Sequence, residues 1–356
     1  MHGYLSTTLF ALVIISSIVS ARPAAAIDIP TVPVGNPGNP GDFEFSPDTG
    51  GRAGAVANVY RIGTTEVTVG QYTTFLNAVA KTDTYELYNA AMATDLNIAG
   101  IARSGAPGSY SYSVIGSPNK PVTYVGWGDA ARFSNWLNNG QPTGAQNAAT
   151  TEAGAYDLNG AVSNGALLAV SRNANATWFL PTNDEWYKAA YYQPAAEGGD
   201  VDGYWKYATQ SNTFPTSAPP PGSPGVQTNI ANIRTLSTGA YAVTGSGVYD
   251  PNQNYLTDVG AYSSAKSFYG TYDQLGNVWE WTETAWADMS PTPFFRILRG
   301  DSWATSNYRF LSNYSPTFES SDFGFRVASV PEPGTAVLAA VACGMLFWAK
   351  TRRQWR

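Results

Sequence analysis

The chain has 356 residues, with 20 Lys and Arg against 26 Asp and Glu, which gives a formal net charge of −6. Its single histidine, His2, and its single cysteine, Cys343, lie near the two ends, so residues 27–330 contain neither. This composition excludes a Ser-His-Asp triad, a thiol nucleophile and disulfides within that segment. Zinc, copper and iron sites favour imidazole or thiolate ligands, whereas a hard cation such as Ca²⁺ needs only oxygen atoms.

The first 26 residues predict a secretory signal peptide. An apolar run from Leu9 to Val19 is followed by three alanines at 24–26, an A-x-A pattern typical of a cleavage site. The Pro- and Gly-rich stretch 27–54 then predicts a flexible lead-in. Residues 27–330 carry 15 Lys and Arg against 25 Asp and Glu. An exported domain this acidic is not expected to bind nucleic acid.

The domain proper is predicted to span residues 55–329 as a single unit. Residues 59–81 predict a strand, a turn and a helix. The apolar residues of that helix recur at helical spacing: Tyr72, Phe75, Leu76 and Val79. Residues 121–139 repeat this order, with an extended piece before a helix. The inward residues expected there are Ala130, Phe133, Trp136 and Leu137.

Residues 178–192 predict a third helix. Pro181 and Thr182 favour a helix start, and Asp184 and Glu185 fall in the first turn, where the helix dipole favours carboxylates. Long stretches rich in Gly, Asn, Ser and Thr predict loops, at residues 141–170 and 208–228. The sequence therefore predicts an α+β domain with few helices, short strands and long loops.

The C-terminal segment 330–356 predicts a membrane-targeting tail. A short apolar run from Thr335 to Ala349 is followed by a basic cluster: Lys350, Arg352, Arg353 and Arg356. The run is short for a stable span, which needs about 20 residues, and the basic cluster would stay on the cytoplasmic side.

Val-Pro-Glu-Pro at 330–333, then the apolar run, then arginines closely resemble the PEP-CTERM sorting tail of bacterial exported proteins. The resemblance implies recognition and removal by membrane-bound sorting machinery. It also implies transient anchoring in the inner membrane, then release to the cell surface or extracellular matrix. A simple C-terminal membrane anchor is the alternative. Both place the domain outside the cytoplasm.

Five stretches in order resemble the formylglycine-generating enzyme family, also called sulfatase-modifying factor domains. They are IGTTEVTVGQYTTFLNA, PVTYVGWGDAARFSNWLN, FLPTNDEWYKAA, YDQLGNVWEWTET and LRGDSWATSNYRF…FGFRVAS. The resemblance covers residues 55–329. It implies an irregular α+β fold related to C-type lectins, with Ca²⁺ bound through oxygen ligands. It also implies an oxidase chemistry that uses two cysteines and copper.

Two departures from the family pattern argue against that chemistry. Counting from Arg299, the two cysteine positions are occupied by Thr305 and Phe310. Threonine has no thiolate to hold copper(I), and phenylalanine has no ligand atom, so a copper cofactor is not expected. Iron-dependent relatives use a histidine-rich partner domain, and residues 27–330 have no histidine.

The resemblance carries over a calcium site. The ligands that it implies are the side chains of Asp273 and Glu280 and the backbone carbonyls of Gly276 and Val278. This spacing lets a tight turn direct several oxygen atoms at one ion, and Gly276 permits the turn. The alternative is that the two carboxylates cap a turn. A first calcium site is implied at Asn232 and the Ile233 carbonyl, with Asp250 as a distant candidate whose spacing departs from the family.

The segment around the lost cysteines predicts a ligand or peptide groove. Its candidate lining residues are Ser302, Trp303, Asn307, Tyr308 and Arg309. The alternative is that the aromatic rings at 303 and 308 pack inward. We expect Arg299 to pair with a carboxylate and Arg326 to be a satisfied core arginine. Lys188 lacks a partner for Schiff-base chemistry.

Together these features predict an exported, calcium-stabilised, non-oxidase binding or structural module of the cell envelope or extracellular matrix. A glycan is the leading partner, since PEP-CTERM proteins as a group are linked to exopolysaccharide; an envelope protein is another. A divergent sulfatase-modifying enzyme is the second hypothesis, and a structural surface protein without a specific ligand is the third.

Overall fold

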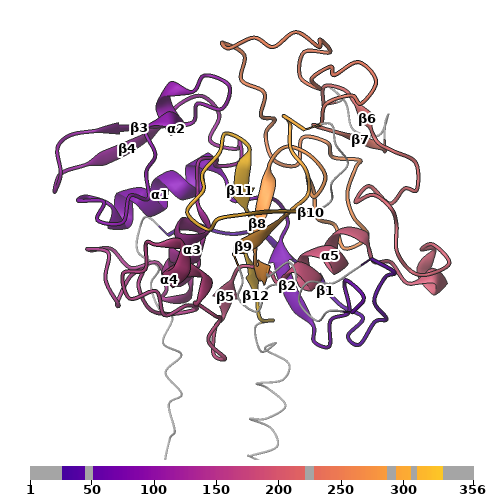
Figure 1. Ribbon diagram of the computed structural model, residues 1–356, viewed down its shortest axis with the longest axis horizontal. Helices are drawn as coiled ribbons and strands as arrows, with labels where there is room; N and C mark the ends of the chain where they lie inside the picture. Colours follow the sequence, from indigo (N-terminus) through magenta and orange to yellow (C-terminus); the bar gives the residue numbers. More distant parts are fainter. Residues whose placement is uncertain (1–25, 45–50, 221–227, 287–293, 306–310, 332–356) are drawn as a thin grey trace, which may run out of the picture.

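The computed structural model describes residues 26–44, 51–220, 228–286, 294–305 and 311–331. It shows the expected α+β architecture, in which short strands and a few helices are joined by long irregular segments (Figure 1). Nearly all of the predicted signal peptide and sorting tail lies outside the described residues. Among the described residues, no helix combines the length and apolar character that a membrane span requires.

The first sheet joins the two ends of the domain. Its strand order is β1-β2-β12-β5, and its strands are β1 (Thr31–Val34), β2 (Tyr60–Gly63), β12 (Ala328–Ser329) and β5 (Trp178–Phe179). All neighbouring strands in it are antiparallel. The last strand of the domain, β12, therefore lies between β2 and β5, which come earlier in the chain.

The expectation of a flexible lead-in at 27–54 is wrong for its described part. Strand β1 pairs with β2 over four residues, and Val34 is fully buried. Further along, the Gly38 amide donates to the Val56 carbonyl and the Asp42 amide to the Ala53 carbonyl. Proline and glycine here shape turns that pack against the domain, so the folded unit begins well before residue 55.

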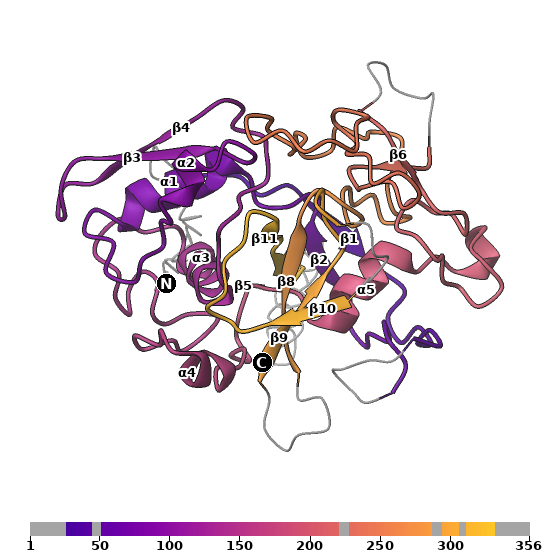
Figure 2. The same cartoon turned by 45° about the horizontal axis from the view of Figure 1, so that its top comes forward.

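The second sheet lies at the centre of the molecule, with strand order β10-β9-β8-β11. Its strands are β8 (Trp279–Trp286), β9 (Phe295–Arg299), β10 (Leu311–Tyr314) and β11 (Phe323–Phe325). Strand β11 runs parallel to β8, whereas the other pairs are antiparallel. In both views this sheet lies between α1 and α3 on one side and α5 on the other (Figures 1 and 2).

The three longer helices form where the sequence predicts them. They are α1 (Val69–Val79), α3 (Trp127–Asn138) and α5 (Asn183–Tyr191). Capping boxes start α1 at Thr68 with Gln71, and α5 at Thr182 with Glu185, which satisfies amide groups that have no helical partner. All the apolar residues predicted to face inward are buried.

Shorter elements complete the chain. The described parts of the predicted loop regions 141–170 and 208–228 contain one short helix and one short strand. The remaining elements are α2 (Ala91–Thr94), β3 (Ile101–Ser104), β4 (Ser111–Val114), α4 (Asn164–Leu168), a 3-10 turn (Ala195–Glu197), β6 (Thr216–Ser217) and β7 (Ile230–Ala231). Strands β3 and β4 form an antiparallel hairpin, and β6 pairs with β7 in parallel.

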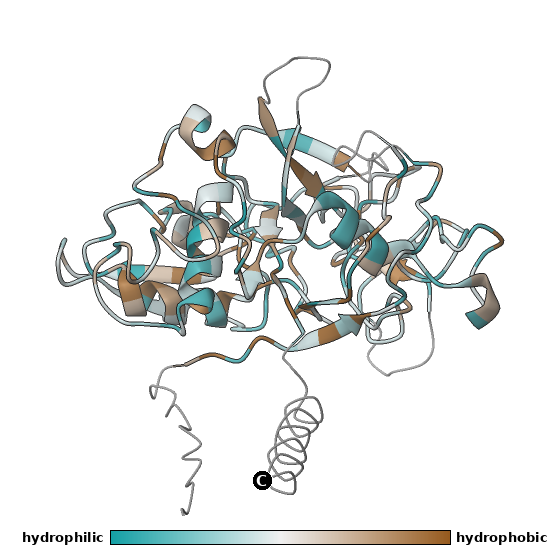
Figure 3. Ribbon diagram, turned by 90° about the horizontal axis from the view of Figure 1, so that it is seen from below, coloured by the Kyte–Doolittle hydropathy of each residue, from teal (hydrophilic) through white to brown (hydrophobic). Residues whose placement is uncertain are grey.

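Aromatic side chains from separate elements meet in the main core. The Phe133 ring of α3 lies 5.3 Å from Phe75 of α1 and 5.3 Å from Phe325 of β11, both edge to face. Apolar and polar segments alternate along the helices and strands (Figure 3), as expected for elements that bury one face each. This packing fixes the loops that precede β8, where the predicted calcium site lies.

Candidate functional site

The segment before β8 forms a tight turn. Three of its residues have positive φ: Asp273 at 59°, Gly276 at 91° and Asn277 at 62°. A Cβ added at Gly276 would lie 2.5 Å from the Asn232 carbonyl oxygen, so only glycine fits there. The Asn277 amide donates to that same oxygen at 2.9 Å. The turn therefore brings the two predicted calcium segments, at 232 and at 273–280, against each other.

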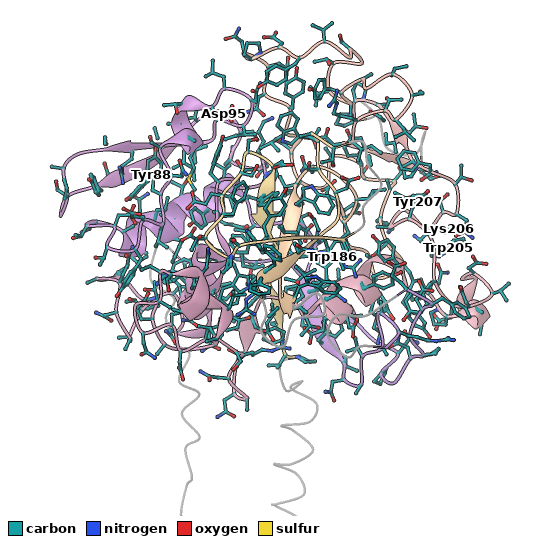
Figure 4. The ribbon with its side chains drawn as sticks, in the orientation of Figure 1. Tyr88, Asp95, Trp186, Trp205, Lys206 and Tyr207 are labelled. Carbon is teal, nitrogen blue, oxygen red and sulfur yellow. The ribbon has the colours of Figure 1, made fainter. Side chains whose placement is uncertain are left out.

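Glu280 is fully buried at the start of β8. Its carboxylate accepts hydrogen bonds from Arg326 at 2.5 and 2.6 Å and from the Trp186 indole N–H at 2.7 Å. Trp186 lies beside the central strands (Figure 4). Arg326 also donates to the Gly63 and Tyr272 carbonyls. Arg326 is thus the satisfied core arginine that the sequence predicts, and it already engages both oxygens of one predicted calcium ligand.

Glu66 belongs to the same cluster, although the sequence reading missed it. Its side chain is buried; Oε1 accepts from the Asn277 side-chain amide at 3.2 Å, and Oε2 has no hydrogen-bond partner. Burial raises the pKa of Glu66 well above its usual value, and the Asp273 and Glu280 carboxylates raise it further. No local signal marks Glu66, because it precedes α1 and only the fold brings it to the turn.

Asp273 is the third carboxylate. Its Oδ2 accepts from the Gly260 amide at 2.6 Å. Burial raises its pKa to about 6, Glu280 adds to the shift, and the Gly260 hydrogen bond and Arg326 oppose it. Three buried carboxylates therefore face one guanidinium. Such an excess of negative charge is costly in the interior unless protons or a cation offset it.

The donor atoms of this cluster are of the kind that a hard cation prefers, but their side chains do not form a complete site. The donor set consists of oxygen atoms, and Glu66 Oε2 is an orphaned acceptor beside Asp273 and Glu280. In the described parts of the chain, no group of three His, Cys, Asp or Glu side chains is close enough to hold a metal by itself. An ion here would need the Gly276 and Val278 carbonyls as well, as the resemblance implies. The calcium site stays a prediction.

At the other predicted site, hydrogen bonds already engage both implied ligands. The Asn232 side-chain amide donates to the Tyr255 carbonyl at 2.9 Å and to Asn277 Oδ1 at 3.1 Å. The Ile233 carbonyl accepts from the Ser217 hydroxyl at 2.5 Å. Asp250 is exposed, and its carboxylate accepts from the amide of Asn252 in its own loop at 2.8 Å. These contacts tie Asn232 to the turn and Asp250 to the loop after it.

The segment at 301–305, where the resemblance implies one of the family's cysteine positions, contains hydroxyl–carboxylate pairs. The Thr305 hydroxyl donates to Asp301, and the Ser302 hydroxyl donates to Asp322 at 2.8 Å. Burial raises the pKa of Asp301 to about 7 and also raises that of Asp322. These groups can exchange protons with each other, but none of them is a soft metal ligand.

Two of the predicted groove residues belong to the interior. Ser302 is fully buried, and Trp303 stacks on Tyr255 with ring centroids 4.9 Å apart and planes 2° from parallel. Trp303 thus packs inward, which was the alternative to a groove-lining role. The other predicted positions lie outside the described residues: Asn307, Tyr308, Arg309 and Phe310.

Helix α5 connects several of the other residues that the sequence analysis named. Glu185 completes the capping box, whereas Asp184 accepts from the Gly54 amide at 3.0 Å, so the two carboxylates diverge as expected. Arg299 donates to the side-chain oxygen of Asn183, an amide, at 2.6 Å. Lys188 donates to the Asn36 carbonyl at 2.8 Å, and burial lowers its pKa to about 8. The helix therefore anchors the N-terminal segment.

Two curated proteins share part of this sequence. Hercynine oxygenase of Mycolicibacterium smegmatis is 30% identical over 154 residues, which cover 37% of this chain and 28% of that protein. The inactive C-alpha-formylglycine-generating enzyme 2 of Mus musculus is 36% identical over 84 residues, which cover 21% of this chain and 26% of that protein. The matched part is about a quarter of each relative's length.

Solved structures with a related shape include CarF and Treponema denticola variable protein 1. CarF has a TM-score of 0.49 at 19% identity, covering 86% of this chain and 100% of its own. The Treponema protein has a TM-score of 0.46 at 20% identity, covering 86% of this chain and 96% of its own.

The family profile described as the Sulfatase-modifying factor enzyme 1-like domain matches residues 38–330. The match begins upstream of the start predicted at residue 55, in the segment that carries the Gly38 and Asp42 hydrogen bonds to the domain. It runs to the end of the first sheet and includes every stretch on which the resemblance rests. The chain therefore belongs to the family of Sulfatase-modifying factor enzyme 1-like domains.

Proposed function

We propose that this protein is an exported, calcium-stabilised binding or structural module of the cell envelope or extracellular matrix that lacks the oxidase chemistry of its family. The observation that carries the proposal is the hydroxyl of Thr305 at the first cysteine position, bonded to Asp301. With no cysteine or histidine anywhere in residues 27–330, the domain has no thiolate and no imidazole to hold copper(I).

The relatives support this reading in part. One of them is named an inactive formylglycine-generating enzyme, whereas another is named an oxygenase. A divergent sulfatase-modifying enzyme is therefore the second candidate. It is favoured by the buried pair of Asp301 and Asp322, each next to a hydroxyl group, because perturbed carboxyls occur at catalytic sites.

Delivery and partners follow from the two ends of the chain. The signal peptide and the sorting tail would direct the domain across the inner membrane, where membrane-bound sorting machinery would process it. A glycan or an envelope protein would then be its partner. A structural role without a specific ligand is the third candidate.

A conversion assay tests the proposal. Purified protein is incubated with calcium, copper and a cysteine-containing sulfatase peptide, and mass spectrometry measures aldehyde formation. A family member that keeps both cysteines serves as the positive control, and the metals alone as the blank. We expect no aldehyde above the blank. Turnover above it would show that a cysteine-free oxidase exists here and would overturn the proposal.

A further inference from the structure

Two adjoining hollows lie on the side of the molecule formed by α1, α3 and the β3–β4 hairpin. The first, of about 390 Å³, is lined by the loop at 84–86, the start of α3 and the turn at 316–319. The second, of about 340 Å³, is lined by residues 82, 83, 86 and 88–90 together with Arg103, Tyr110 and Glu319. Glu86 and Glu319 line both, so the hollows form one groove, which we call the acidic groove.

The acidic groove is separate from the predicted calcium cluster. None of the three clustered carboxylates, Glu66, Asp273 and Glu280, lines either hollow. Tyr88, which lines the second hollow, lies on the opposite side of the molecule from Tyr207, and Trp186 lies between them (Figure 4). Residues 301–305 line neither hollow either, so a ligand in the groove would use neither the calcium cluster nor that segment.

An exposed aromatic pair lies close in sequence to the lining of the groove. The turn that contributes Pro316, Thr317 and Glu319 to the lining also carries Phe318, and Tyr314 ends the strand before it. The two rings stack with centroids 4.9 Å apart, and 39% of Tyr314 and 45% of Phe318 is exposed. Both rings rest on the buried ring of Phe323, which fixes their orientation. Such a rigid exposed platform suits the C–H face of a ligand.

The groove has a surplus of negative charge. Asp83, Glu86, Asp129 and Glu319 line it, together with Arg103 and Arg132. Arg132 already forms a two-pronged pair with buried Glu152, at 2.7 and 3.1 Å, and Arg103 pairs with Asp83 at 3.3 Å. Both arginines of the lining are therefore already paired with other carboxylates. Neither is free to neutralise Glu86, Asp129 or Glu319. An acidic ligand would be repelled here.

The remaining lining suits hydroxyl groups. It offers the hydroxyls of Thr82 and Thr84 and carboxylate oxygens that accept hydrogen bonds, whereas the Thr317 hydroxyl already donates to Asn164 and the Asn89 amide to Glu319. The lining of the second hollow is mostly polar, which disfavours the apolar anchor side chain on which peptide affinity usually depends; the larger apolar residues of the groove, Val162, Leu167 and Pro316, lie in the first hollow. Burial and mutual repulsion raise the pKa values of Asp129 and Glu319, as expected where carboxyls share a confined space.

We propose that the acidic groove, together with Tyr314 and Phe318, is a binding site for a non-acidic glycan. The aromatic pair would stack on a sugar ring, and the carboxylates and threonines would bond its hydroxyl or amino groups. This rests on the binding-module function proposed above, for which it names a site and a ligand class.

Binding is measured by calorimetry on the full-length chain in mild detergent. The probes are three hexasaccharides of similar length: neutral N-acetylglucosamine, cationic glucosamine and anionic uronate. We expect the neutral and cationic probes to bind, and the anionic probe to bind at least about tenfold more weakly. Phe318→Ala should lower the affinity for the neutral probe about tenfold or more. Phe43→Ala is the matched control, because Phe43 is 74% exposed, lies outside the groove and should leave binding unchanged.

Two further variants separate binding from folding. Phe318→Leu keeps an apolar side chain on Phe323 but removes the aromatic face, so it should fold and still lose affinity. Glu319→Gln should remove any preference for the cationic probe over the neutral one.

The proposal fails if no probe binds, if the uronate binds as tightly as the neutral probe, or if Phe43→Ala and Phe318→Ala lose affinity equally. It also fails if a lysine-rich peptide outcompetes the sugars. Any of these outcomes with a negative aldehyde assay would overturn the glycan site alone. Aldehyde formation would instead overturn the non-oxidase function, whatever the probes do.

Discussion

At the scale of single residues, the Arg326 guanidinium faces three buried carboxylates. Replacing it with methionine would leave Glu66, Asp273 and Glu280 without that partner. Breaking a buried pair in this way typically costs about 3–5 kcal/mol, because the remaining charge stays buried. We therefore expect Arg326→Met to lower the free energy of unfolding by about that amount, measured in urea without calcium.

The matched comparison is Arg103→Met. Arg103 also pairs with a carboxylate, Asp83; that carboxylate is only 2% exposed, but the Arg103 side chain is 29% exposed, so water reaches the guanidinium. Water screens such a pair, and its contribution is typically no more than about 1 kcal/mol. Losses of similar size in the two variants would contradict the view that Arg326 neutralises a buried cluster.

Asp301 predicts a dependence of stability on pH. Burial raises its pKa in the folded protein to about 7, whereas in the unfolded chain it stays near 4. The folded state thus holds this proton more tightly, so the stabilisation is complete below about pH 4 and is lost as the pH rises to about 7. Asparagine at 301 cannot ionise, and it keeps an oxygen for the Thr305 hydroxyl and the Ser302 amide.

We therefore expect Asp301→Asn to flatten the fall in unfolding free energy between pH 4 and 7, measured by urea titration at each pH. Asp200→Asn is the comparison, because hydrogen bonds from the Val201 amide and the Asn212 side chain lower the pKa of Asp200. That variant should keep the slope of the wild type. If Asp301→Asn keeps it as well, Asp301 is not the group responsible.

At the scale of elements, the three long helices are predictable because their signals are local. Thr68 with Gln71 and Thr182 with Glu185 are capping pairs three residues apart, and the apolar positions between caps recur at helical spacing. Strand β1 was missed for the opposite reason. Its composition is that of a linker, and its pairing depends on β2, about 30 residues further along the chain.

Val34 tests whether this N-terminal segment is part of the fold. Its side chain is fully buried in β1, so Val34→Ala should cost about 2 kcal/mol of unfolding free energy, close to the value of burying a valine. Val201→Ala removes the same atoms from a side chain that is 96% exposed and should cost almost nothing. If Val34→Ala and the wild type had equal melting temperatures, the N-terminal segment would be a flexible lead-in after all.

At the scale of the whole molecule, the candidate site is an assembly of distant segments. The residues at 273–280 could be named from the sequence because the family resemblance implies them as one short, continuous motif. Glu66 and Asn232 join it only through the fold, by way of Asn277, which donates to Glu66 and, through its backbone, to the Asn232 carbonyl. Sequence reasoning could therefore name part of the site but not the surplus charge that defines it.

The surplus of buried negative charge predicts that calcium stabilises the folded protein. A cation bound only by the folded state stabilises it by about 2.7 kcal/mol when its concentration is a hundred times the dissociation constant. We expect the melting temperature to be higher in excess calcium than in chelator, measured by calorimetry. Magnesium should do less, because it demands a tighter octahedral geometry.

The variant Glu66→Gln tests whether the calcium effect on the melting temperature arises from the cluster of three buried carboxylates. Removing one of three buried carboxylates relieves repulsion, so this variant should melt at a higher temperature than the wild type in chelator. It should also gain less from calcium, because one charge that attracts the ion is gone. Glu197→Gln, at an exposed position, should leave the calcium increment unchanged. Identical wild-type melts in calcium and in chelator would mean that protons and Arg326 alone offset the buried charge, and that the cluster is a structural device without a metal.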